Sequence, residues 1–232
     1  MSNIVIAEGL SKTYDVQPVL QNLQLQLPAG RIIGLLGPNG CGKTTFMKIL
    51  AGLIGDYQGR VLIDGQQPGE YTKSIVSYLP EKTYLSDWMK VKDALDLFQD
   101  FYADFDRPKA EELLHRFQLS PGMKLKSMSK GMQEKVQLIL VMCRSAKLYI
   151  LDEPLSGVDP AARSVILDTI IRNYNEQSTV LLSTHLIYDV EQIFDDIIML
   201  GYGQVMMAGE TDLLRQQTGK SIDQLFREVF RC

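Results

Sequence analysis

With 232 residues the chain is long enough to bury a large core, and its 45% hydrophobic and 22% charged residues are typical of a globular protein. A net charge of -4 without a run of lysines or arginines speaks against nucleic acid as the main partner. The longest apolar run, 136–142, is far shorter than the roughly 20 residues that span a bilayer, and no secretory signal pattern begins the chain. Cys41, Cys143 and Cys232 have neither disulfide nor zinc spacing, which suits a reducing cytoplasm.

The first part of the chain predicts strands at 4–10, 19–27 and 31–36, with a turn-rich loop at 11–15. Apolar residues at alternate positions of the second strand are typical of a half-buried antiparallel strand. The third strand is a near-continuous apolar run, which is typical of a buried parallel strand.

A glycine-rich segment joins this third strand to a predicted helix at 46–53. It fits the phosphate-binding pattern of two glycines five positions apart followed by Lys and then Thr, and it comprises Gly37, Pro38, Asn39, Gly40, Cys41, Gly42, Lys43, Thr44 and Thr45. In that pattern the loop N–H groups and the helix N-terminus bind phosphate, Lys43 reaches the terminal phosphates and Thr44 ligates Mg²⁺. The alternative is a turn without a ligand, but the flanking strand and helix favour a site for a nucleoside triphosphate.

Cys41 lies inside this loop at a predicted helix N-terminus, where the pKa of a thiol tends to fall. We therefore expect alkylation of Cys41 to inhibit nucleotide binding and bound nucleotide to protect it. The alternative is a small residue chosen for its fit, without a redox role.

Short strands are expected at 60–64 and 75–79, and the pattern then changes. From 86 to 145, apolar residues recur every three or four positions, which predicts helices. Their expected starting points are Ser86–Asp87, Pro108 and Ser129. The aromatic residues of this segment are expected to form mainly its own core rather than a docking surface: Trp88, Phe98, Phe101 and Tyr102.

The α/β pattern resumes with a buried strand at 148–151 that ends in Asp152 and Glu153. A strand that ends in two carboxylates is the usual companion of a phosphate loop. Asp152 would hold the Mg²⁺ shell, and Glu153 would orient or deprotonate the water that attacks the γ-phosphate. The alternative is an acidic helix cap after a core strand.

The remaining patterns predict a helix from Pro160, whose core face carries Val165, Ile166, Thr169 and Ile170. They also predict a strand at 179–182 that leads to His185, a hairpin of 197–200 and 204–208, and helices at 212–217 and 222–230.

Taken together, these motifs resemble the ATP-binding subunits of ABC transporters over nearly the whole chain. The resemblance implies an α/β fold with a P-loop NTPase core, made of a mixed, mainly parallel sheet and an antiparallel β subdomain, with a helical subdomain inserted at 86–145. The core would comprise 1–85 and 146–232. Tyr14 is similar to the aromatic residue that stacks on adenine, and His185 to the switch histidine beside the γ-phosphate. His115 reads as a solvated surface residue.

Residues 128–133 fall where the family signature Leu-Ser-Gly-Gly-Gln is expected. Ser129 and Gly131 match it, whereas Lys130 and Met132 depart from it. In this family the signature binds ATP held by the opposite subunit, and Asp159 lies in the matching dimer-contact loop. The resemblance therefore implies a homodimer, or a dimer with a closely related second subunit.

Glu81 stands where most relatives have a glutamine that approaches Mg²⁺. A carboxylate can ligate Mg²⁺ at least as well, so the expected metal residues are Thr44, Glu81 and Asp152. A plain loop glutamate is the alternative.

The resemblance implies ATP hydrolysis with Mg²⁺ at the cytoplasmic face of the membrane, powering export through a separate multi-span permease. Lys130 and Glu81 resemble the bacterial drug, peptide or lipid exporter branch. A soluble ABC ATPase that acts as an assembly factor stays open as an alternative, and the signature segment disfavours a small-molecule kinase.

Overall fold

The computed structural model describes residues 2–175 and 177–231, without the side chains of 160–162. A six-stranded sheet in the order β5-β6-β7-β3-β8-β9 forms its centre. Five neighbouring strands are parallel: β5 (Val76–Leu79), β6 (Leu148–Asp152), β7 (Thr179–Ser183), β3 (Ile32–Leu36) and β8 (Asp196–Gly201). The edge strand β9 (Gln204–Glu210) pairs antiparallel with β8, so the sheet is mixed and mainly parallel, as expected.

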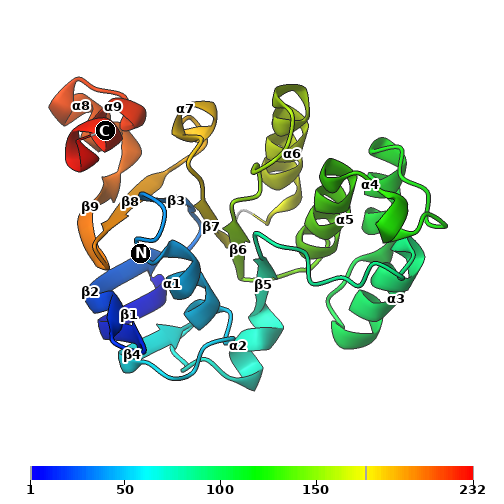
Figure 1. Cartoon of the computed structure of the whole chain (residues 1–232), viewed down its shortest axis with the longest axis horizontal. Coiled ribbons are helices and arrows are strands. Elements are labelled where there is room, and N and C mark those ends of the chain that lie inside the picture. Colours follow the sequence, from blue (N-terminus) through cyan, green and yellow to red (C-terminus); the bar gives the residue numbers. More distant parts are fainter. Residues whose placement is uncertain (1, 176, 232) are drawn as a thin grey trace.

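A second, antiparallel sheet packs beside the first in the order β2-β1-β4. It consists of β1 (Asn3–Tyr14), β2 (Gln17–Pro28) and β4 (Gln58–Ile63), and it shares a buried core with the helix α1 (Lys43–Leu50) (Figure 1). The prediction of a loop at 11–15 was wrong for 11–14. Pairing of Lys12, Thr13 and Tyr14 with β2 continues the strand, because cross-strand hydrogen bonds override the local turn composition.

The predicted helices agree with the structure in part. α1 begins three residues earlier than expected, directly after Gly42, and α2 (Glu70–Ile75) and α7 (Ile187–Val190) were not predicted because they are too short to show a period. In α6 (Pro160–Asn173) the residues Ile166, Thr169 and Ile170 are buried as expected. Val165 was wrongly placed on that face, since it is exposed. The hairpin β8–β9 and the helices α8 (Thr211–Thr218) and α9 (Ile222–Phe230) are confirmed.

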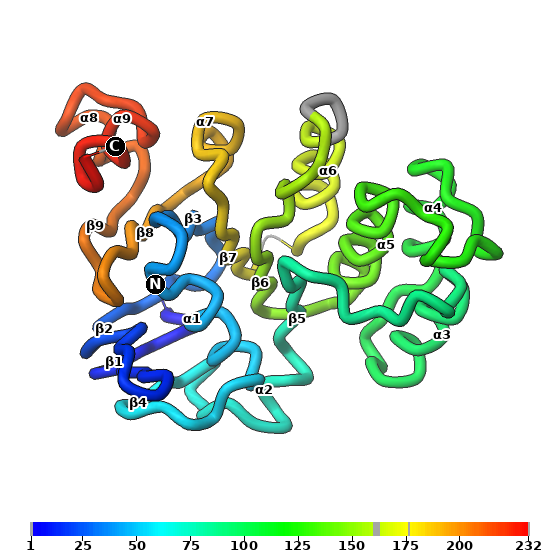
Figure 2. The backbone as a smooth tube through the Cα atoms, viewed as in Figure 1, coloured from blue at the N-terminus to red at the C-terminus, as the bar shows by residue number. Residues whose placement is uncertain are grey.

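Three helices form a group at one end of the molecule, beyond β5: α3 (Val91–Phe101), α4 (Arg107–Arg116) and α5 (Lys130–Met142) (Figure 1). The backbone enters this group after β5 and returns from α5 to β6 (Figure 2). Its apolar cluster draws on residues between Leu85 and Cys143, and this supports our proposal of a helical subdomain at 86–145.

The starting points predicted for these helices are correct at two of three sites. Asp106 caps α4, with Pro108 in its first turn, and Ser129 caps α5 by accepting a hydrogen bond from the Met132 backbone. The expected cap at Ser86–Asp87 is wrong, because α3 begins after Lys90, whose backbone N–H donates to the Asp93 carboxylate.

The aromatic residues of the helical group do not all belong to its core. Phe98 is buried and Tyr102 packs against the same cluster. Trp88 and Phe101, however, are 73% and 75% exposed, so the expectation was wrong for these two. They add apolar surface that a partner can cover.

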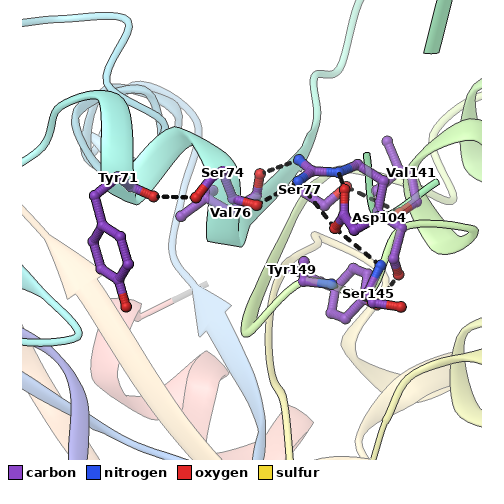
Figure 3. A network of polar contacts seen from close by, with 10 residues as sticks. Tyr71, Ser74, Val76, Ser77, Asp104, Val141, Ser145 and Tyr149 are labelled. Carbon is purple, nitrogen blue, oxygen red and sulfur yellow. Dashed lines mark hydrogen bonds and ion pairs between the residues drawn. The ribbon is translucent and has the colours of Figure 1, made fainter. Parts of the chain in front are cut away.

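Arg144 joins the helical group to the core. This 3% exposed side chain donates to the carbonyl oxygens of Val76 (2.7 Å) and Ser74 (2.5 Å), and both oxygens of the Asp104 carboxylate lie 3.1 Å from its nitrogens. Figure 3 shows Asp104 and the end of α2 meeting at this point. Its guanidinium carbon also lies 3.8 Å from the centre of the Tyr102 ring. One buried cation therefore ties three segments of the chain together.

We predict that Arg144→Met lowers the free energy of unfolding by about 3 kcal/mol, because it removes the cation that pairs with the Asp104 carboxylate and the donor to two carbonyl oxygens. Urea denaturation measures this change. Arg172→Met is the control, since Arg172 forms an exposed ion pair with Asp168, and it should cost under about 1 kcal/mol. Equal changes in the two variants would contradict the role of Arg144.

Candidate functional site

The glycine-rich loop curls between the end of β3 and the start of α1, and its glycines are required by the backbone. Gly42 has a φ of +107°, which strongly favours glycine. A Cβ on Gly37 would lie 2.2 Å from the carbonyl oxygen of Leu200, so only glycine fits there. The loop is thus packed against the end of β8, the neighbour of β3 in the sheet, and this contact fixes its conformation.

A cavity of about 490 Å³ opens in front of this loop. It brings together segments that are far apart in the sequence, and its lining residues are Val19, Asn39, Gly40, Gly42, Lys43, Thr44, Thr45, Glu81, Glu153, Ser156 and His185. Eight of these are residues we predicted for the loop and the two catalytic positions, and Glu81, which we predicted for the metal side, lines the same cavity. Val19 was not predicted, because nothing in a single apolar residue of a strand distinguishes it.

Lys43 is nearly buried in the centre of the loop. Its ammonium group donates to the carbonyl oxygens of Gly37 (2.6 Å) and Pro38 (3.1 Å). These two bonds use part of its three donors and hold the charge at the cavity wall. The position suits a cation that pairs with phosphate oxygens entering the cavity.

Asp152 ends β6 with a buried carboxylate. Its Oδ1 accepts a hydrogen bond from the Ser183 hydroxyl at 2.7 Å, whereas Oδ2 is buried without a hydrogen-bond partner among the described residues. A buried carboxylate oxygen without a donor is costly, so the site fits a cation or its water shell. Thr44, on the wall of the adjoining cavity, offers a hydroxyl oxygen of the kind that Mg²⁺ prefers.

The protein alone supplies few metal ligands. Within residues 2–175 and 177–231 there is no group of three or more His, Cys, Asp or Glu side chains arranged to hold a metal ion. At nucleotide sites, phosphate oxygens and water usually supply most of the ligands of a magnesium ion.

Glu153 has a left-handed backbone, with a φ of +51°. This strained conformation is held by its N–H, which lies 3.2 Å from the carbonyl oxygen and 3.0 Å from the hydroxyl oxygen of Ser183. The side chain turns to His185, whose Nδ1 lies 2.8 Å from Glu153 Oε2. Strain at a non-glycine residue is a common feature of functional sites, and here it aims the carboxylate at the imidazole. Ser183 was not among the predicted site residues, since a serine at a strand end carries no distinctive pattern.

Several predicted residues lie outside the cavity. Tyr14 is exposed at the end of β1, where the Lys12 ammonium nitrogen lies 4.7 Å from its ring centre. Ser129 and Gly131 begin α5 in the helical group, and Asp159 lies just beyond Ser156. Gly37, Pro38, Cys41 and Asp152 also do not line the cavity.

Cys41 corrects one expectation. The thiol is only 6% exposed, and burial raises its pKa despite the nearby Lys43. The helix N-terminus was expected to lower that pKa, but the loss of hydration outweighs it. Cys143 is also buried and free, and Cys232 lies outside the described residues.

A raised pKa leaves less thiolate at a given pH than an unperturbed cysteine has. We therefore predict that iodoacetamide alkylates Cys41 much more slowly in the folded chain at pH 8 than in urea, and that the rate rises as the pH increases. Mass spectrometry of the peptide that contains Cys41 measures both rates. Comparable rates in folded and unfolded protein would contradict a buried thiol.

Comparisons with known proteins agree with this geometry. A model of the family described as "ABC transporter" matches residues 20–156, which is more than half of the chain. An uncharacterized ABC transporter ATP-binding protein of Methanocaldococcus jannaschii is 34% identical over 88% of this chain and 77% of its own length. The daunorubicin resistance ATP-binding protein of Streptomyces coeruleorubidus is 30% identical over 97% and 74%.

Similarity in structure extends over nearly the whole chain. A solved ATP-binding subunit of an ABC transporter superposes with a TM-score of 0.87, at 29% identity, over 98% of this chain and 99% of its own. The family model covers the phosphate loop, the segment that begins α5 and the strand that ends in two carboxylates. The chain therefore belongs to the ABC transporter family, as an ATP-binding subunit.

Proposed function

We propose that this chain hydrolyses ATP and thereby powers export of a substrate through a separate membrane permease. The observation that carries the proposal is the cavity in which the phosphate loop faces the Glu153–His185 pair. A triphosphate in the loop would have its terminal phosphate beside a carboxylate that can act on water.

Each residue of the cavity has a proposed role. Lys43 and the loop N–H groups bind the phosphates, and Thr44, Asp152 and Glu81 hold Mg²⁺ directly or through water. Mg²⁺, when bound, supplies positive charge that neutralises the phosphate oxygens. Glu153 orients the attacking water and accepts its proton.

His185 is proposed to act together with Glu153 at the γ-phosphate. With Nδ1 next to the carboxylate, the other ring nitrogen is available toward the γ-phosphate. Tyr14, outside the cavity lining, is proposed to stack on the adenine ring, and its exposed position at the end of β1 leaves it accessible.

We propose that two subunits complete each site. Ser129 is exposed at the N-terminus of α5 and lies outside the cavity of its own subunit, so it and the positive end of the α5 dipole are free to bind a phosphate held by a second subunit. Lys130 lies over the dimer-contact loop: a Cβ on Gly157 would come within 2.6 Å of its ammonium nitrogen. The signature segment (128–133) and the dimer-contact loop (156–159) thus form one continuous surface for the second subunit.

The permease is proposed to dock in a groove between α1, β5 and α3. This groove has a volume of about 540 Å³, and its apolar lining includes Leu53, Tyr78, Tyr84, Leu97 and Phe101. The apolar groove is proposed to receive a segment of the permease at the cytoplasmic face of the membrane. No helix in the described part of the chain is long and apolar enough to cross a membrane. The relative from Streptomyces, named for daunorubicin resistance, supports the drug exporter branch.

A soluble assembly factor without a channel is the second candidate. Co-purification from membranes distinguishes the two: a multi-span partner supports transport, whereas association only with soluble scaffold proteins would refute it. Nucleic acid is not proposed as a partner, given the net charge of -4.

We predict that Glu153→Gln lowers the rate of ATP hydrolysis at least about a hundredfold and leaves ATP binding within a few-fold, because the amide keeps the shape but accepts no proton. With ATP and Mg²⁺ the variant should accumulate as a dimer in analytical ultracentrifugation.

The matched control is Glu191→Gln, a carboxylate that contacts Arg215 and the backbone of Asp223 away from the cavity, and it should retain turnover. A Glu153→Gln variant that stays monomeric with ATP and continues to hydrolyse it would contradict the mechanism.

A further inference from the structure

Tyr78 carries a buried hydroxyl that the proposed roles leave unused. The oxygen atom has no hydrogen-bond partner in the part of the chain that the structure describes. Burial raises the pKa of Tyr78, and the carboxylates of Asp152 and Glu81 add to the effect, so the phenol lies near both acidic groups of the proposed metal site. A buried hydroxyl without a partner is costly unless a ligand or water completes it.

The strand register places Tyr78 and Asp152 on the same face of the sheet. Tyr78 on β5 is paired with Ile150 on β6, and paired residues of parallel strands point to the same face of the sheet. Because side chains alternate, Asp152 shares that face, about 6.6 Å further along β6. A tyrosine side chain is long enough to bring its hydroxyl most of that way.

Two orphaned polar atoms therefore lie on one face of the sheet. Tyr78 supplies a buried donor, and Asp152 Oδ2 is a buried acceptor, and neither has a protein partner among the described residues. The two groups are complementary as hydrogen-bond partners, since a phenol O–H donates and an ionised carboxylate or a metal-bound water accepts.

We propose that Tyr78 is a positioning residue of the magnesium site, where its hydroxyl donates a hydrogen bond to Asp152 or to a water of the Mg²⁺ shell. The bond fixes the acceptor in the orientation that the metal requires, as outer-shell donors do at other metal sites. The ring of the same residue lines the groove proposed for the permease, so one side chain contacts both places. This inference rests on the proposed ATP site.

Tyr78→Phe tests the inference because it removes only the hydroxyl. The probe is Mn²⁺, which accepts the same octahedral oxygen ligands as Mg²⁺, added with a non-hydrolysable ATP analogue. The electron paramagnetic resonance signal of free Mn²⁺ gives its affinity. We expect Tyr78→Phe to weaken Mn²⁺ binding about tenfold, the effect of one hydrogen bond to a charged group. Binding of the analogue without metal should stay within about twofold of the parent chain.

Tyr71→Phe is the matched control. Its hydroxyl also contacts an aspartate, donating to Asp64 at 2.5 Å, but on α2 and outside the site. Its Mn²⁺ affinity should equal that of the parent chain. The melting temperature of Tyr78→Phe without ligands should not fall, since the lost hydroxyl has no hydrogen-bond partner among the residues that the structure describes.

Three results would overturn the inference: an unchanged Mn²⁺ affinity in Tyr78→Phe, an equal loss of metal-free nucleotide binding, or a lower melting temperature. The last two would reveal a purely structural role. A parent chain that binds no nucleotide would instead overturn the proposed function, so the two failures are distinguishable.

Discussion

The candidate site depends on one serine whose hydrogen bonds link two neighbouring strands. Ser183, at the end of β7, is paired in register with Asp152 on β6. Its hydroxyl donates to the Asp152 carboxylate and accepts from the Glu153 N–H, and its carbonyl oxygen lies near the same N–H. Parallel strands present their carboxyl ends at one edge, so this pairing fixes the Asp152 carboxylate and the strained Glu153 together. A shift of one residue between β6 and β7 would turn both away from the loop.

Much of this arrangement can be predicted from the sequence, because the signals are local. The glycine pattern needs only its own strand and helix, and Ser129 at the start of α5 is a helix cap that a short window reveals. The paired carboxylates can be interpreted as metal and catalytic residues because a phosphate loop precedes them in the sequence. These features stay interpretable without knowing which strands are neighbours.

The rest could not be predicted, since it depends on packing between distant segments. The strand β1 runs through a turn-like stretch because β2 pairs with it, and the Cys41 thiol loses its helix-terminus activation through burial. Trp88 and Phe101 share the helical period of the core residues around them but are exposed. The arrangement of Ser183 and Tyr78 around Asp152 is likewise invisible until β5, β6 and β7 are aligned.

In the dimer that we propose, each ATP site combines the loop of one subunit with Ser129 of the other. The most direct test mixes two inactive variants, Lys43→Ala and Ser129→Arg, after subunit exchange. A mixed dimer contains one site with an intact loop and an intact signature. An equimolar mixture should therefore recover about a quarter of the parental ATPase activity. Activity that stays at the level of the separate variants would contradict a shared site.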